Sequence, residues 1–142
     1  MITLINHQGL KTVSGIQVQT PAPSIGLAYI GAFLKLHGYS YKAIDACGEG
    51  LEQIRPHNYL SDVVVQGLTI DEVIGRIPKN SKIIGFSCLY SHCWPLVLDM
   101  AKVVRRVYPY AMLVVGGEHP TAMPYQSLDN ELFDIAILGE GE

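Results

Sequence analysis

Small and polar residues gather in three loops of this chain, and each loop directly follows a short apolar run. The loops are residues 87–91, 116–121 and 139–142. In a parallel sheet the carboxyl ends of neighbouring strands meet at one edge, and open α/β sheets bind their ligands there. The sequence therefore predicts a ligand site formed by these three loops.

The residues that begin two of the loops have two interpretations each. Glycine at Gly116 and Gly117 leaves no Cβ in the way of a ligand, but a tight turn with positive φ also calls for glycine. The Ser87 hydroxyl can donate to a ring nitrogen or accept from a backbone amide, and it can also serve as a cap or turn residue. Both interpretations remain open for each of these positions.

Cysteine and histidine residues near the loops raise the question of a metal site. Cys88 and Cys93 lie five residues apart on one loop with no second pair nearby, which disfavours a structural zinc site. His7 and His119 are single histidines in loops, a setting that more often gives a surface or hydrogen-bonded residue than a catalyst. No metal ligand is therefore predicted from the residues.

The remaining polar signals are weaker. Glu118, Glu140 and Glu142 could act as an acid–base pair, but no nucleophile accompanies them, so a solvated or ribose-binding role is favoured. No Gly-x-Gly-x-x-Gly opens the first helix, and no Gly-Lys-Ser/Thr occurs, so neither a dinucleotide fingerprint nor a P-loop is present.

Composition excludes several classes of partner. The chain of 142 residues suits one domain, and its net charge of −3 without a basic patch argues against nucleic acid. No apolar run approaches the roughly 20 residues that span a bilayer, and the N-terminus lacks a signal-peptide pattern. Three cysteines in no disulfide-like pattern favour a reducing cytoplasm. The 49% hydrophobic content fits a dense parallel-sheet core or a face that docks onto another domain.

Hydrophobic patterning predicts strands that alternate with helices. We expect strands at 2–6, 39–45, 82–87, 112–115 and 134–138, and helices at 25–37, 70–77, 95–108 and 125–132. Segments 7–24 and 46–60 are expected to be irregular, and residues 63–65 fit either a minor strand or a packed loop.

Two features of this pattern bear on the fold. The helix at 25–37 is apolar nearly all round, so we expect it to be buried on most sides. Alternating strands and helices predict an α/β fold with a doubly wound, five-stranded parallel sheet in the flavodoxin-like order 2-1-3-4-5. The last strand runs into Glu142 without a covering helix, so we expect the chain to be part of a larger protein.

Taken together, the segments resemble the N-terminal cobalamin-binding domain of cobalamin-dependent radical S-adenosylmethionine enzymes. The resemblance covers nearly the whole chain and rests on the order and spacing of short segments. They are Pro23-Ser-Ile-Gly-Leu-Ala-Tyr-Ile30, Ile44-Asp-Ala46, Gly67-Leu-Thr-Ile-Asp-Glu72, Ile84-Gly-Phe-Ser87 through Trp94, Val115-Gly-Gly-Glu-His-Pro-Thr121 and Gly139-Glu-Gly-Glu142.

The resemblance implies a cofactor and a geometry. Cobalamin's nucleotide tail would lie between the sheet edge and the flanking helices, and the corrin ring over the carboxyl ends of the strands. Ser87 and Leu89 correspond to the serine-x-leucine element of cobalamin domains, and Gly116 and Gly117 to the glycine pair beside the tail. The implied cofactor-binding residues are Ser87, Cys88, Leu89, Tyr90, Ser91, Gly116, Gly117, Glu118, His119, Pro120, Thr121, Gly139, Glu140 and Gly141.

Two departures from related patterns qualify the resemblance. Methionine-synthase-like cobalamin domains carry Asp-x-His-x-x-Gly after the first strand, whereas this chain has Asn6-His-Gln-Gly-Leu-Lys11. We therefore expect no protein histidine on cobalt, although His7 stays a minor alternative, and a lower cobalt face met by Leu89, Tyr90 or a water. The Cys-x-x-x-Cys-x-x-Cys motif that holds a 4Fe–4S iron–sulfur cluster is absent.

The resemblance thus implies that residues 1–142 are a cobalamin-binding Rossmann-like domain of a longer enzyme. A C-terminal radical barrel in the same chain would bind S-adenosylmethionine and the iron–sulfur cluster, and methyl transfer from methylcobalamin would be the commonest outcome. Two alternatives remain: a ligand-free scaffold that docks the barrel, and a flavodoxin-like nucleotide binder that uses Thr12, Ser14 and Gly15 in its first loop.

Overall fold

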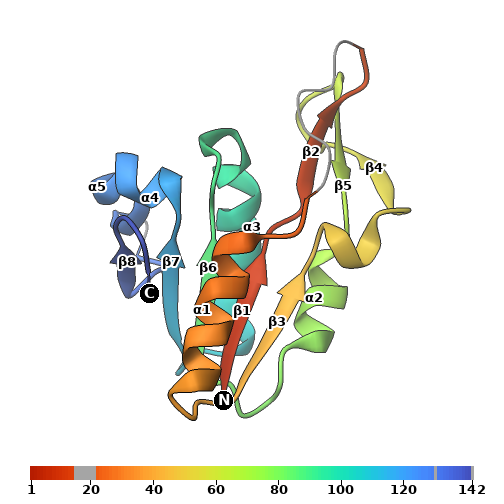
Figure 1. Cartoon of the computed structure of the whole chain (residues 1–142). Coiled ribbons are helices and arrows are strands. Elements are labelled where there is room, and N and C mark those ends of the chain that lie inside the picture. Colours follow the sequence, from red (N-terminus) through yellow and green to blue (C-terminus); the bar gives the residue numbers. More distant parts are fainter. Residues whose placement is uncertain (15–21, 130, 142) are drawn as a thin grey trace.

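The computed structural model describes residues 1–14, 22–129 and 131–141. Its main sheet has five parallel strands in the order β3-β1-β6-β7-β8 (Figure 1). The strands are β1 (Ile2–Asn6), β3 (Tyr41–Asp45), β6 (Ile83–Ser87), β7 (Met112–Gly116) and β8 (Ile135–Ile137). This order is the predicted 2-1-3-4-5 arrangement, so the predicted fold class is confirmed.

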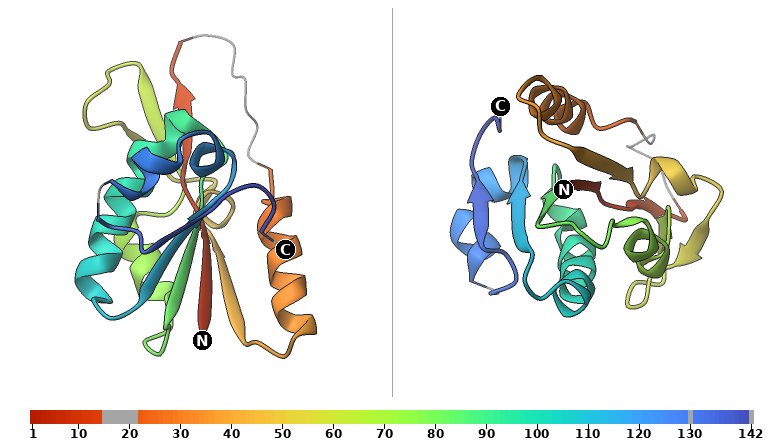
Figure 2. Two further views of the ribbon diagram at one scale, coloured as in Figure 1. Left: turned by 90° about the vertical axis from the view of Figure 1, so that its left-hand side faces the viewer. Right: turned by 90° about the horizontal axis from the view of Figure 1, so that it is seen from below.

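Helices cover the two faces of this sheet unequally. In Figure 2, α1 (Ile25–Leu36) lies on one face, and α2 (Ile70–Arg76) and α3 (Trp94–Val107) lie on the other. The main contacts of α1 with the sheet are to β1 and β3. We call the side that carries α2 and α3 the closed face, and the side that carries α1 the open face.

Three local sequence signals produce these helices as predicted. The Ser24 hydroxyl accepts from Leu27 N at the start of α1. Thr69 and Glu72 form a capping box at α2, in which each side chain bonds the other residue's backbone N–H. Pro95 occupies the first turn of α3, where its missing N–H costs no hydrogen bond.

The closed face holds the hydrophobic core. Alternate residues of the central strands point into it, because side chains along a strand alternate between faces. They pack against one apolar side of α3, which agrees with the periodicity of residues 95–108. The fully buried members include Ile5, Ile44, Ile84, Leu113, Val115, Val97, Met100 and Val104.

The prediction that the first helix is buried on most sides is wrong. Of its residues only Gly31 is buried, while Ile25, Tyr29 and Leu36 are 70%, 63% and 79% exposed. An all-apolar helix is ambiguous because its composition cannot say which side faces the sheet. Here a narrow side contacts β1 and β3, and the rest forms an exposed apolar stripe.

A second sheet includes short parts of two segments that were expected to be irregular. It has three antiparallel strands in the order β2-β5-β4 and projects past the carboxyl ends of the main strands (Figure 1). The strands are β2 (Gly9–Thr12), β5 (Val63–Gln66) and β4 (Ile54–Pro56). The structure thus resolves residues 63–65 as a strand, and the short partners at 9–12 and 54–56 are the part that sequence periodicity missed.

Smaller differences occur around the short helical elements. Glu118–Ala122 forms helix α4 where only a loop was expected, and α5 spans Pro124–Leu128, so the predicted helix ends early. Two 3-10 turns, η1 (Gly48–Gly50) and η2 (Ser91–Cys93), complete the elements. Within the described ranges, no helix has the length and apolar character needed to cross a membrane.

Candidate functional site

Strand register places a row of small and polar residues on the open face, next to the carboxyl edge. Each residue in the row pairs with the next across neighbouring strands. From β3 to β8 the row is Asp45, Asn6, Ser87, Gly116 and Ile137. Two residues nearer the amino edge, the parallel row is Ala43, Leu4, Gly85, Val114 and Ile135.

Over β6 and β7 the middle of these rows has small side chains beside Val114, and we call this stretch of Gly85, Ser87 and Gly116 the trough. Gly85, Ser87 and Gly116 contribute no side chain larger than a hydroxymethyl group, and α1 lies to one side over β1 and β3. A Cβ added at Gly116 would make ordinary van der Waals contact with Ile137 Cβ at 3.7 Å, so this position has room for a small side chain. Gly116 is not among the glycines with positive φ, so its backbone does not require glycine, and ligand access stays a prediction for this position.

Gly85 was not among the predicted site residues. A Cβ there would lie 3.3 Å from Leu4 Cδ2, so Gly85 lets the Leu4 side chain pack directly against the sheet beside Ser87. The period-two alternation of a strand puts residues 85 and 87 on the same face. That alternation is the signal that could have found Gly85.

Gly117 fits the second interpretation, a tight turn with positive φ. Its φ is +113°, and an added Cβ would lie 2.6 Å from the Cys88 carbonyl oxygen. The chain turns sharply here into α4, with Gly117 as the residue before the helix. Gly117 is therefore required by the backbone turn, and the predicted glycine pair splits into two roles.

Hydrogen bonds bring the three predicted loops together. Cys88 N donates to Gly116 O over 2.8 Å, and His119 N donates to Cys88 O over 3.1 Å, which joins the loops after β6 and β7. Gly139 N donates to Thr121 Oγ1 over 2.9 Å, which joins the loop after β8 to α4. The expected convergence of the loops at one sheet edge is confirmed.

The loop after β6 presents both exposed and buried side chains. Leu89 and Tyr90 are exposed at the edge, and the Tyr90 ring stacks on His92 with centroids 5.6 Å apart. Cys88 is fully buried, and its thiol donates to Tyr90 O. Burial and the neighbouring Cys93 raise the pKa of Cys88 to about 12, so this thiol stays neutral and is a poor nucleophile or metal ligand.

His119 is buried between the loops and is only 3% exposed. Its Nδ1 lies 2.9 Å from Ser91 Oγ, and its ring packs on Trp94 with centroids 4.4 Å apart. Its Nε2 is buried and has no hydrogen-bond partner among the described residues. Burial lowers the pKa of His119, so the neutral imidazole is favoured.

Neighbouring site residues complete the edge. Pro120 is buried beside His119, whereas Glu118, Glu140 and Gly141 are exposed. An added Cβ at Gly141 would lie 3.4 Å from Ile30 Cδ1 of α1, so the end of the described chain borders the open face. Glu142 lies outside the described residues.

His7 follows β1 at the same edge. Its Nδ1 donates to the Gln8 carbonyl, which leaves the lone pair of the neutral ring on Nε2. Desolvation is the main reason that the pKa of His7 is lowered, and the Gln8 hydrogen bond opposes it. Within residues 1–14, 22–129 and 131–141, no three histidine, cysteine or acidic side chains are grouped so that they could hold a metal ion.

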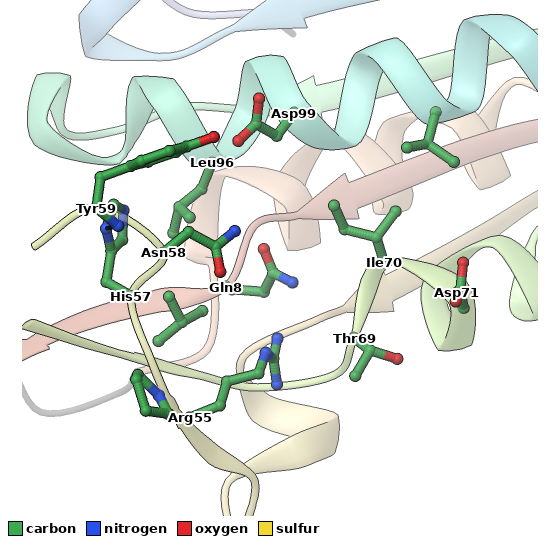
Figure 3. Close-up of a pocket in the computed structure, with 13 residues that line it drawn as sticks. Gln8, Arg55, His57, Asn58, Tyr59, Thr69, Ile70, Asp71, Leu96 and Asp99 are labelled. Atoms are coloured by element: carbon green, nitrogen blue, oxygen red, sulfur yellow. Dashed lines mark hydrogen bonds between the residues drawn. The ribbon is translucent and has the colours of Figure 1, made fainter.

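Two hollows lie outside the three loops. One of about 360 Å³ lies between the small sheet and helices α2 and α3, where Figure 3 shows the side chains of Gln8, Arg55 and Leu96. Arg55 donates to the carbonyls of Gly67 and Leu68, at 2.7 and 2.9 Å, so its guanidinium braces the β5–α2 junction. A second hollow of about 330 Å³ is lined by residues that include Arg105 and Asp134.

The residues expected for a flavodoxin-like phosphate loop lie only partly within the described structure. Thr12 pairs with Val63 in the small antiparallel sheet, and Gly15 lies outside the described residues. Residues 9–12 therefore belong to a strand of the small sheet, and the phosphate loop stays a prediction.

Comparisons with known proteins identify the family of this chain. No curated protein and no solved structure gave a significant match to the chain. The profile of the B12 binding domain matches residues 11–142, which is nearly the whole chain. This chain therefore belongs to the B12 binding domain family.

Proposed function

We propose that this chain is the cobalamin-binding module of a radical S-adenosylmethionine enzyme, in which the cobalamin tail lies on the open face. Membership of the B12 binding domain family supports cobalamin as the ligand. The observation that carries the placement is the pairing of Ser87 with Gly116 at the carboxyl edge of the open face, where neither residue has a large side chain. A slot for a planar base needs missing side chains, and this is where the sheet lacks them.

The residues fit the parts of this cofactor. The nucleotide base and its ribose would lie along the trough, with the Ser87 hydroxyl as the polar group nearest the open Gly116 position. The corrin ring, broad and partly apolar, would contact the exposed Leu89 and Tyr90 at the edge. Gly117 and Thr121 support the site indirectly. Gly117 allows the turn into α4, and the Thr121 hydroxyl accepts from Gly139 N.

Cobalamin, when bound, would supply a methyl group for transfer to a substrate radical. The residues of this chain hold and orient the cofactor and carry no part of the bond-making chemistry. The buried Cys88 and Cys93 thiols stay protonated, with pKa values raised to about 12 and about 11, so they do not compete for the cobalt.

The direct test is titration of the protein with hydroxocobalamin, followed by visible spectroscopy and calorimetry. A Gly116→Leu variant fills the trough and is expected to lose at least about 100-fold in affinity, because both tail contacts and desolvation are lost. Gly75→Leu is the matched control: Gly75 lies in α2 on the closed-face side, and an added Cβ there meets nothing within 4 Å.

Cobinamide, a corrinoid that lacks the nucleotide tail, separates tail binding from ring binding. The wild-type chain should bind cobinamide more weakly than cobalamin, and Gly116→Leu should not weaken cobinamide further. If Gly116→Leu and Gly75→Leu bind cobalamin equally well, the placement of the tail is wrong. A spectrum of bound flavin would instead favour the nucleotide-binding alternative. If no corrinoid binds in a saturable way, the ligand-free alternative is favoured.

The cobalt environment gives a second test. With no histidine on cobalt, the spectrum of the bound cofactor should stay base-off-like between about pH 5 and pH 8, where an ordinary histidine titrates. His7 is the alternative ligand because its Nε2 lone pair is available. A base-off spectrum unchanged in His7→Gln supports the proposal, and a spectral change in that variant overturns this part.

The radical domain is the most distant part of the proposal. This sequence has no Cys-x-x-x-Cys-x-x-Cys motif, so the cluster chemistry would belong to another part of the enzyme. The exposed apolar stripe of α1 supports a module that works against another protein surface. The natural protein, purified without oxygen, should carry about four iron and four sulfide per chain and form 5′-deoxyadenosine from S-adenosylmethionine. A natural protein free of iron would overturn this part alone.

A further inference from the structure

An aromatic ladder connects the elements behind the cofactor loops. Phe86 of β6 contacts Phe133 edge to face at 5.5 Å, Phe133 packs on Trp94 at 5.7 Å, and Trp94 packs on His119 at 4.4 Å, all between ring centroids. The ladder thus runs from the sheet through the start of α3 to α4. His119 is its last ring and the only one of the four that can change charge.

His119 joins two loops by both its backbone and its side chain. Its N–H donates to Cys88 O over 3.1 Å, and its Nδ1 lies 2.9 Å from the Ser91 hydroxyl oxygen. Cys88 and Ser91 belong to the loop after β6, while His119 follows the turn after β7. If the His119 side chain leaves its buried position, the two loops lose these contacts. These are the loops that the proposed function places at the corrin ring.

The buried Nε2 makes the neutral ring necessary. A buried N–H donor without an acceptor is rarer and more costly than a buried lone pair, so the arrangement favours Nδ1–H donating to Ser91 and Nε2 unprotonated. Adding a proton would create both a buried unpaired donor and a buried charge.

No charged neighbour offsets this cost. The titratable residues of the loop after β6 and of α4 near His119 are Cys88, Tyr90, His92, Cys93 and Glu118. Burial alone accounts for the lowered pKa of His119, with no contribution from a charged neighbour. The two thiols are neutral, and Asp134 is bonded to Arg105. Among the described residues, no carboxylate forms an ion pair with His119.

We propose that His119 is a positioning residue whose neutral imidazole holds the loops after β6 and β7 in the cobalamin-binding arrangement, so that acidification releases the cofactor. This inference rests on the proposed function. The direction follows from linkage: the pKa of His119 is lowered in the folded chain, so the arrangement is fully stable above the ordinary value of 6.5 and loses stability as pH falls below it.

The test measures hydroxocobalamin affinity from pH 8 to pH 5. In the wild type the dissociation constant should rise below about pH 6.5, by at most tenfold per pH unit because one proton is taken up. His119→Gln keeps an amide that can bond Ser91 but cannot titrate, so its profile should be flat. His37→Gln is the matched control, because His37 is an exposed histidine at the far end of α1; it should keep the wild-type slope.

A second readout needs no cofactor. Trp94 is the only tryptophan of the chain and stacks on His119, so its fluorescence should titrate in the same pH range in the ligand-free protein. That signal tests the wild type directly, even if His119→Gln fails to fold. A flat fluorescence profile in the wild type, or an affinity slope that persists in His119→Gln, overturns the proposal.

These outcomes are distinguishable from a failure of the proposed function. A chain that binds no cobalamin at any pH contradicts the cobalamin site itself. Binding that is tight and independent of pH contradicts only the role of His119. The spectrum of the bound fraction is a separate quantity, since the amount of bound cofactor can fall while its base-off form is unchanged.

Discussion

The two faces of the main sheet use the same strands for opposite purposes. On the closed face, alternate residues such as Ile84, Leu113 and Val115 are completely buried under α2 and α3. On the open face, the residues between them include Gly85 and Gly116, and the covering helix α1 has its main contacts with β1 and β3. Folding stability is therefore concentrated on one face, which leaves the other free to lack side chains.

This asymmetry separates two kinds of small residue that a sequence shows as equal. A small residue on the closed face would leave a cavity in the core, which is costly. On the open face it costs little, since solvent or a ligand takes the place of the missing side chain. Glycine and serine at the carboxyl edge of β6 and β7 are thus tolerated where a binding trough is useful.

The sharpest test of the asymmetry compares adjacent residues of β7. Leu113→Ala removes a fully buried side chain from the closed face and should lower the free energy of unfolding by about 3 kcal/mol. Val114→Ala, its neighbour on the open face, should cost about 1 kcal/mol or less because Val114 is only partly buried. Urea unfolding of both variants checks the difference, and equal losses would show that the open face carries as much stability as the closed face.

A smaller effect is expected from the two adjacent glycines. Gly117→Ala places a Cβ at positive φ and against the Cys88 carbonyl, so it should destabilise the chain by more than about 1 kcal/mol. Gly116→Ala meets only ordinary contacts at 3.7 Å and should change the free energy of unfolding by less than about 0.5 kcal/mol.

Thermal and urea unfolding of the Gly117→Ala and Gly116→Ala variants show which glycine the backbone conformation requires. If Gly116→Ala is as damaging as Gly117→Ala, then Gly116 is also a turn residue, and the trough loses its main support. This comparison is also the reason that Gly116, and not Gly117, is the position to test for cobalamin binding.

Much of the fold follows from local sequence signals. Capping at Ser24 and Thr69, and the one-sided apolar pattern of α3, depend on residues near each other in the chain, so they were predicted with their positions. The small sheet was not, because residues 9–12 and 54–56 are too short to show a period and are strands only through pairing with β5. The exposure of α1 was missed for a related reason: packing between distant segments decides it.

The site was predictable at the level of loops and less so at the level of residues. Convergence of the loops follows from parallel topology, which alternating strands and helices already indicate. The separate roles of Gly116 and Gly117 depend on φ and on one carbonyl, and no composition rule gives either. The burial of His119 depends on Trp94 and Ser91, which lie more than twenty residues away in the sequence.

The smallest predicted effect concerns the polar edge of the closed face. Asp134 Oδ2 accepts from Arg105 Nη2 over 2.8 Å and from Leu113 N over 2.7 Å, which ties α3 and β7 to the start of β8. Although burial opposes ionisation of this carboxyl, the Arg105 and Leu113 hydrogen bonds outweigh it and hold the pKa of Asp134 below its ordinary value of 3.8. The stabilisation is therefore fully present above about pH 4 and is lost as pH falls through the lower folded value.

Asp134→Asn should lower the free energy of unfolding at pH 7 by less than about 1 kcal/mol, since the carboxylate is 46% exposed and water screens the pair. The gap between wild type and variant should narrow as the pH approaches 3, because the wild-type carboxyl then becomes protonated. Asp62→Asn, at an exposed position in the loop before β5, is the control and should show no such gap. A gap that widens towards acid would mean that Asp134 is held protonated in the fold, and the closed face would then lack the polar tie between α3 and β8.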